Sequence, residues 1–145
     1  MTDPTAASTQ LITVDELPES VREAVAEYGG RYGVEGLLDA TTMAARTTTP
    51  STRPRRFWRS QKPSSSYTLL SPHGLVVVAT EPEVAVTGWR LGGGEVRRVT
   101  ESVAGGLHVT ALRFGSAVRE TMLVPLAGDD EGAAFEAALV LAVSA

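Results

Sequence analysis

Apolar residues in the second half of the chain come in short runs that are separated by glycine-rich or proline-containing turns. The clearest run is aliphatic throughout, at residues 75–79. A short continuous apolar run between turn residues is typical of a strand that is covered on both faces. Similar runs lie on either side of it along the chain. The pattern predicts six strands, at about residues 66–70, 75–79, 84–91, 95–103, 107–114 and 118–126.

Alternation along the last two predicted strands indicates how they face the core. Val118, Met122 and Val124 share one face of the last strand and Arg119 and Thr121 point the other way, because successive side chains of a strand point to opposite faces. In the strand before it, the apolar positions change faces between Ala111 and Leu112, which predicts a bulge or a strand that passes between two layers. Short, regularly spaced strands favour an antiparallel meander, and hence a sandwich or a barrel.

The end of the sequence has the spacing of a helix. Phe135 and Leu139 recur at helical intervals, and Asp129 or Asp130 is placed to accept hydrogen bonds from the first free N–H groups. We therefore predict a C-terminal helix over about residues 129–143 that covers one end of a bent sheet. The same capping role, rather than metal binding, explains the acidic run Asp129, Asp130 and Glu131.

About six or seven antiparallel strands followed by one helix resemble the pleckstrin-homology-like (PH-like) superfold, including its small bacterial variants and the GRAM type. Residues 67–78 are similar to a strand–turn–strand unit of bacterial members, in which an apolar pair leads through a polar turn into an aliphatic run. The resemblance covers about residues 57–143. It implies a mainly β (α+β) fold, an antiparallel meander that forms a PH-like barrel or bent sandwich with a C-terminal helix. The seventh strand of such a fold is expected near residues 57–61 or hidden by a bulge.

The first half of the chain carries a different pattern. We predict a disordered start before Leu11, a helix over residues 18–28 that stops at Gly29 and Gly30, and a second helix over residues 35–45. Capping-box spacing at residues 13–16 and 20–23 supports the first helix, whose buried stripe is Val21, Ala24, Val25 and Tyr28. Residues 47–56 and 62–66 are polar and are predicted to be loops. The chain thus divides into an N-terminal helical extension and basic linker, residues 1–63, and a PH-like β domain, residues 64–145.

Composition narrows the class of protein. Hydrophobic residues make up 43% and charged residues 21%, which is typical of soluble globular proteins. The absence of cysteine excludes disulfides and thiolate chemistry. The chain shows neither a signal-peptide pattern nor a run of about 18 apolar residues, so we expect a cytoplasmic protein with no transmembrane segment. Lys62 is the only lysine among 13 basic residues, a bias common in GC-rich bacterial genomes.

Charge is divided between the two parts of the N-terminal region. Residues 1–45 carry eight acids and two arginines, whereas residues 46–62 carry six basic residues and no acid. Within the basic part, arginines could grip phosphate or carboxylate oxygens, and the two aromatic side chains could stack on bases or insert at a membrane interface. The alternative is a solvated loop beside the acidic helix, with its aromatics leading into the core. The candidate contact residues are Arg53, Arg55, Arg56, Phe57, Trp58, Arg59 and Lys62.

Other candidates have simpler explanations. The run of three glycines at residues 92–94 is predicted to be a hairpin turn, because a phosphate-binding loop needs a helix after it. His73 is predicted to lie in a turn and His108 on the surface of the sheet, and we find no set of metal ligands around them. Trp89 is predicted to pack in the core, or to anchor a partner if it is exposed.

We therefore expect a bacterial, non-enzymatic binding or scaffolding module that recognises a protein partner or an anionic ligand. The alternatives are peripheral binding to anionic lipid through residues 53–62, an enzyme of unrecognised type, and nucleic-acid binding through the arginines. The pI of about 5.2 counts against nucleic acid. No cofactor or metal is expected. Formation of a homo-oligomer is open, because a meander leaves sheet edges that can pair.

Overall fold

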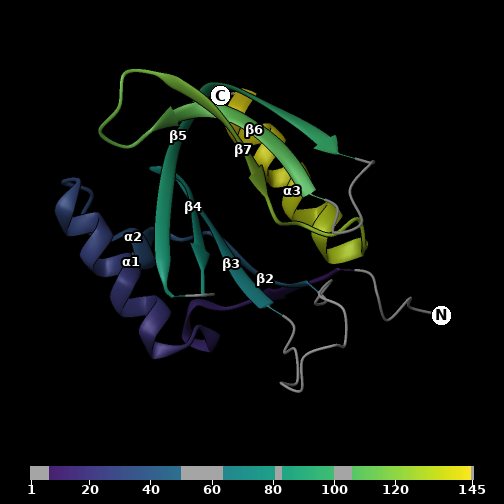
Figure 1. The fold of residues 1–145 in the computed structure, drawn as a ribbon, viewed down its shortest axis with the longest axis horizontal. Coiled ribbons are helices and arrows are strands. Elements are labelled where there is room, and N and C mark those ends of the chain that lie inside the picture. The colour runs from purple at the N-terminus through teal and green to yellow at the C-terminus, as the bar shows by residue number, and fades with distance from the viewer. Residues whose placement is uncertain (1–6, 50–63, 81–82, 100–105, 145) are drawn as a thin grey trace, which may run out of the picture.

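Seven antiparallel strands, placed side by side in chain order, form one open sheet in the computed structural model, which describes residues 7–49, 64–80, 83–99 and 106–144. The sheet is strongly bent, and helices pack on both of its faces (Figure 1). The strands are β1 (Ser8–Ile12), β2 (Met43–Thr49), β3 (Ser64–Ser71), β4 (Gly74–Ala79), β5 (Ala85–Val99), β6 (Gly106–Arg113) and β7 (Arg119–Val124).

Three α-helices and one 3₁₀ turn accompany the sheet within the described residues. A single 3₁₀ turn, η1 (Val14–Glu16), is followed by α1 (Glu19–Arg31) and α2 (Leu37–Ala40), all between β1 and β2. The last element, α3 (Asp130–Ser144), follows β7. The predicted C-terminal helix and its cap are confirmed, because Asp129 Oδ1 accepts a hydrogen bond of 2.9 Å from the backbone N–H of Gly132.

The central strand β4 is covered on both faces, as its aliphatic run predicts. Leu75 packs in the cluster on the α3 side of the sheet, whereas Val76 and Val78 pack in the cluster on the α1 side. All three side chains are buried. Since a strand with both faces buried needs apolar residues at every position, the run of valines follows from the two-sided cover.

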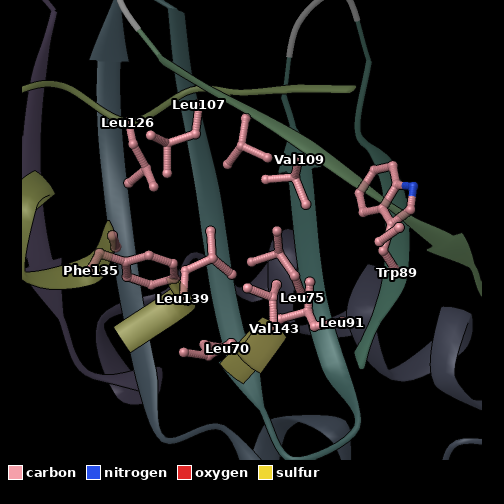
Figure 2. Packing of buried hydrophobic residues seen from close by; sticks show 13 residues of the cluster. Leu70, Leu75, Trp89, Leu91, Leu107, Val109, Leu126, Phe135, Leu139 and Val143 are labelled. Carbon is pink, nitrogen blue, oxygen red and sulfur yellow. The ribbon is translucent and has the colours of Figure 1, made fainter. Parts of the chain in front are cut away.

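The cluster on the α3 side is the larger of the two. Phe135 and Leu139 of α3 are fully buried and point toward the sheet, where they meet Leu75 and Leu107 (Figure 2). Trp89 is buried at the border of this cluster, which confirms its predicted place in the core. Apolar burial of this kind contributes roughly 1.5–3 kcal/mol for each large side chain.

The cluster on the α1 side joins the helix to β5. Val21, Val25 and Tyr28 form the buried stripe of α1, as predicted, whereas Ala24, the fourth predicted member, is half-buried. The hydroxyl oxygen of Tyr28 accepts a hydrogen bond of 2.8 Å from the backbone N–H of Gly88. A glycine is needed at residue 88, because a Cβ there would lie 2.6 Å from the ring of Phe114.

The predicted hairpin at the three glycines is wrong. Residues 85–99 form one long strand, which pairs with β4 through residues 85–89 and with β6 from Trp89 onward. Between Arg90 and Glu95 the register shifts, so that residues 91–94 of β5 oppose a single residue of β6. The glycines therefore form a wide bulge, with Gly93 at a φ of +72°, and they lie where β5 passes from one half of the sheet to the other.

The N-terminal half contributes strands that the sequence did not indicate. Ser8, Thr9 and Gln10, expected to be disordered, belong to β1. The predicted helix over residues 35–45 is wrong apart from Leu37–Ala40, since Met43–Thr49 is β2. The first helix runs to Arg31, past the predicted stop at Gly29 and Gly30, and it begins at Glu19, so residues 20–23 do not form a capping box at its start. The box at residues 13–16 is present, at the start of the 3₁₀ turn.

The remaining boundaries differ less. The predicted loops at residues 47–56 and 62–66 are wrong where the structure describes them, because residues 47–49 lie in β2 and residues 64–66 in β3. Val118 precedes β7 and is 66% exposed, so it does not share the buried face of Met122 and Val124. The mainly β, antiparallel fold with a C-terminal helix is confirmed. The predicted division of the chain at residue 63 falls in a stretch outside the described residues and stays a prediction.

Candidate functional site

The predicted contact segment lies outside the described residues in its entirety. Its seven residues stay predictions from the sequence alone: Arg53, Arg55, Arg56, Phe57, Trp58, Arg59 and Lys62. The site described below comes from other residues, on β5, β6 and β7.

The side of the sheet that faces α1 continues past the helix onto these three strands. We call the continued part the outer face. It consists of three rows of cross-strand neighbours, each with one residue from β5, one from β6 and one from β7. The rows are Arg90, Leu112 and Arg119; Glu95, Thr110 and Thr121; and Arg97, His108 and Leu123.

Alternation along β6 shows which side of the sheet these rows occupy. Leu107, Val109 and Ala111 pack in the cluster on the α3 side, so the residues between them point to the opposite side. Phe114 continues that opposite series and packs beside Tyr28 of α1, with ring centroids 6.2 Å apart. The outer face is therefore one surface with the side that α1 covers, and it begins where α1 ends.

The outer face carries more positive than negative charge. Arg90, Arg97 and Arg119 are exposed, and Glu95 is the one acid in the three rows. His108 is half-buried on the sheet surface, as predicted, between Arg97 and Leu123. Arginine forks on a sheet are suited to bidentate hydrogen bonds with carboxylate or phosphate oxygens.

Two contacts fix side chains on this face. The Arg119 guanidinium donates a hydrogen bond of 2.6 Å from Nη2 to the carbonyl oxygen of Gly93, in the bulge of β5. The hydroxyl oxygens of Thr110 and Thr121 lie 2.7 Å apart, one on β6 and one on β7. The glycine bulge of β5 thus positions an arginine of β7, across the intervening strand β6, which restricts the rotamers that a partner would otherwise have to select.

Arg98, in contrast, has a structural role on the α3 side. Its Nε donates to Glu136 of α3 at 2.5 Å, and its Nη1 donates to the carbonyl oxygen of Leu126 at 3.1 Å. Both charged side chains are largely covered. These bonds hold β5 to α3 and to the connection before it, so Arg98 is not available to a ligand.

Tyr28 marks the boundary between the covered side and the outer face. Burial raises the pKa of its hydroxyl above the ordinary value of 10.0, although the hydrogen bond from Gly88 acts in the opposite direction. The group therefore stays protonated at neutral pH. Its ring lies 4.7 Å, between centroids, from the more exposed ring of Tyr32.

The other candidate residues from the sequence lie in a turn or make contacts that stabilise the fold. His73 is exposed in the turn between β3 and β4, as predicted. Asp129 and Glu131 accept hydrogen bonds from the edge of β1, from the N–H groups of Thr9 and Leu11. Among the residues that the structure describes, no group of three or more His, Asp or Glu side chains is placed to hold a metal ion.

Sequence reasoning missed the outer face, although one of its signals was visible. Arg119 and Thr121 were expected to point away from the apolar side chains of their strand, and they do. What could not be seen was the register that places Arg119 in one row with Arg90, across the bulge at residues 91–94. A bulge of unknown length leaves the facing of all later residues on the strand undetermined.

Comparisons of the chain with models of protein families, with curated proteins and with solved structures find no match. Within the described residues, no helix has both the length and the apolar character that crossing a membrane would require.

Proposed function

We propose that the protein is a non-enzymatic binding module, and that its outer face binds an acidic surface of a protein partner. The observation that carries this proposal is the set of three exposed arginines on one face of the sheet, two on β5 and one on β7, of which Arg119 is positioned by the carbonyl oxygen of Gly93. The strand ladder fixes the backbone beneath these residues, so the spacing of the arginines does not have to be ordered when a partner binds.

A protein is favoured over an anionic membrane or nucleic acid by the composition of the face. Glu95 lies between the rows of Arg90 and Arg97, and Leu123 is 46% exposed beside them. An acid within the contact repels a uniformly negative surface, whereas a folded partner can place a cation opposite it. Mixed apolar and charged rows of this kind are typical of the rim and core of protein interfaces.

The order of the elements supports a PH-like architecture as part of the proposal. Seven antiparallel strands in chain order, followed by a helix, match the order that the resemblance implies, with α1 and α2 as an insertion between β1 and β2. The connection after β7 approaches the first strand, because the N–H of Ala127 donates to Oγ1 of Thr9 at 2.8 Å. We therefore propose a PH-like bent sandwich.

Site-specific photo-crosslinking tests the function. A photoreactive amino acid replaces Arg97 on the outer face or, as the matched control, Ala26, which is exposed on α1. In cells that make the protein, we expect position 97 to crosslink to a protein through a segment rich in aspartate and glutamate, and position 26 not to do so. Adding Arg90→Glu and Arg119→Glu should abolish the crosslink.

Two results would overturn the proposal. One is an equal pattern of crosslinks from both positions, or crosslinks that persist after the two charge reversals. The other is salt-sensitive binding to phosphatidylserine vesicles, or to single-stranded DNA, that disappears in the Arg90→Glu, Arg119→Glu variant while no protein is crosslinked. Such binding would assign the outer face to lipid or nucleic acid instead.

A further inference from the structure

The two edges of the sheet differ in how their backbone groups are used. On β1, the outward N–H groups of Thr9 and Leu11 donate to the carboxylates of Asp129 and Glu131, at 2.9 and 3.1 Å. Among the described strands, β7 pairs only with β6, and it ends the sheet. The α3 helix therefore closes one edge of the sheet, whereas the other edge ends in a strand whose second backbone side has no described strand beside it.

The hydrogen-bond ladder shows which residues of β7 present their backbone at that edge. The N–H of Phe114 donates to the carbonyl oxygen of Gly88 on β5, so even-numbered residues of β6 direct their backbone groups toward β5. Odd-numbered residues of β6 then bond to β7, where their partners are Glu120, Met122 and Val124. The outward N–H and C=O groups of β7 consequently belong to Arg119, Thr121 and Leu123, the residues whose side chains lie on the outer face.

The composition of β7 does not protect this edge. Natural edge strands are commonly blunted by lysines, prolines or bulges. Residues 121–124 of β7 are uncharged, and the structure pairs them with β6 without a register shift. β7 contains no proline, and Pro125 follows directly after the strand.

We propose that β7 takes an extended acidic segment of a protein partner as an eighth, antiparallel strand. This inference rests on the proposed function and specifies how the partner binds. Backbone bonds from Arg119, Thr121 and Leu123 would hold about six residues of the segment, the length of β7. Charge complementarity sets its side chains: every second residue is an aspartate or glutamate on the outer face, where Arg119 of β7 is the neighbouring cation.

The alternate residues of the segment are apolar. They lie on the α3 side of the sheet, next to Met122, which is half-buried, and Val124, which is buried. The bound sequence therefore alternates acidic and apolar residues. A segment with the opposite phase would place carboxylates beside Glu120 and apolar groups beside Arg119.

A labelled peptide with a core of alternating glutamate and valine, three of each, is the probe. In the proposed pairing, the glutamate N–H groups point toward β7 and the valine N–H groups point away. One derivative is N-methylated at the three glutamates and its matched control at the three valines, so that charge and composition stay equal. Fluorescence anisotropy measures the affinity of each for the full chain.

We expect the glutamate-methylated peptide to bind at least about tenfold more weakly than the parent, because it loses the backbone bonds to β7. The valine-methylated peptide should bind within about threefold of the parent. Arg119→Glu should weaken the parent peptide at least about tenfold, whereas Arg31→Glu, on the exposed end of α1, should leave its affinity unchanged. Thr121→Pro should also abolish binding, and circular dichroism checks that this variant keeps its sheet.

Equal affinity of the two methylated peptides would overturn strand addition. If Arg119→Glu still weakened binding, the proposed function would stand. A loss of that charge effect would count against the function itself. Absence of any binding at millimolar peptide would overturn the inference too, as would a concentration-dependent dimer that the Thr121→Pro variant no longer forms, since a second copy would then occupy β7.

Discussion

At the scale of single residues, the fold depends on a few polar groups that connect its layers. Tyr28 is the clearest case, because its ring packs in the cluster on the α1 side while its hydroxyl oxygen accepts the N–H of Gly88. Arg98 acts in a similar way on the opposite side, between β5 and α3. Each of them satisfies groups that would otherwise be covered without a partner.

Replacing Tyr28 by phenylalanine should lower the free energy of unfolding at pH 7 by roughly 1–3 kcal/mol, because the N–H of Gly88 loses its acceptor in a buried place. The raised pKa of Tyr28 makes this loss depend on pH. Above about pH 10 the unfolded chain ionises this tyrosine first, so the stabilising contribution falls as pH rises through the folded pKa. Urea unfolding of both proteins from pH 7 to 11 should therefore show a shrinking difference.

The control for this prediction is Tyr32→Phe. Tyr32 is 39% exposed, and its side chain is the nearest aromatic neighbour of Tyr28. We expect a much smaller loss at pH 7 from this variant. A difference for Tyr28→Phe that grew with pH would contradict the linkage argument.

At the scale of elements, α3 does more than cover the sheet. Asp129 caps the helix through Oδ1 and holds the N–H of Thr9 through Oδ2, so one carboxylate serves a helix end and a strand edge. Glu131, one residue inside α3, holds Leu11 on the same edge. The helix therefore fixes β1, a strand whose polar sequence has little tendency to remain in a sheet without such a neighbour.

Asp129→Ala should lower the free energy of unfolding by roughly 2–3 kcal/mol, which combines a lost helix cap with an unpaired strand N–H. The matched control is Asp130→Ala, which removes an exposed acid from the first turn and should cost only about 0.3–1 kcal/mol. Urea denaturation measures both. Hydrogen exchange at the amide of Thr9 should accelerate in the first variant alone; equal losses in the two variants would refute the double role of Asp129.

At the scale of the whole molecule, strands from both halves of the chain share one sheet. β2 pairs with β3 along seven residues, and α1 covers Leu69 and Val76 of the following strands. The cluster on the α1 side is thus assembled from residues on either side of position 63. Residues 64–145 on their own would therefore expose apolar surface that the N-terminal half covers in the whole chain.

We expect the fragment of residues 64–145 not to fold. Without α1 and β2 it exposes Leu69, Val76 and Phe114, each of which contributes roughly 1.5–3 kcal/mol when buried, against a typical total stability of about 5–15 kcal/mol. Circular dichroism and size-exclusion chromatography measure this, with the fragment of residues 7–145 as the folded control. A cooperative thermal transition in the shorter fragment would instead support the predicted domain division.

Much of the C-terminal half could be predicted from sequence because its signals are local. The run of valines in β4 and the helical spacing of Phe135 and Leu139 each indicate burial from neighbouring residues alone. Both segments were predicted correctly as buried. β1 and β2 could not be predicted, since threonine, serine and glutamine do not show whether a strand partner exists. The two strands pair with each other across 32 to 40 residues of chain. The prediction at glycines 92–94 failed for a related reason, because a run of glycines is also compatible with a bulge when a neighbouring strand, here β6, pairs with the residues on both sides of it.

The amino-acid order alone decided where apolar surface must be covered: on both sides of β4, on one stripe of α1 and on the inner side of α3. The buried side of each element follows from the spacing of apolar residues that are close together in the chain, because that spacing matches the period of a strand or a helix. Tertiary structure alone decided the partners of the polar strands, the continuity of β5 and the gathering of Arg90, Arg97 and Arg119 on the outer face. The physical reason is that strand pairing and register depend on backbone hydrogen bonds between distant segments. Every residue type except proline supplies the same N–H and C=O groups to these bonds, so the residue types alone do not specify the partner.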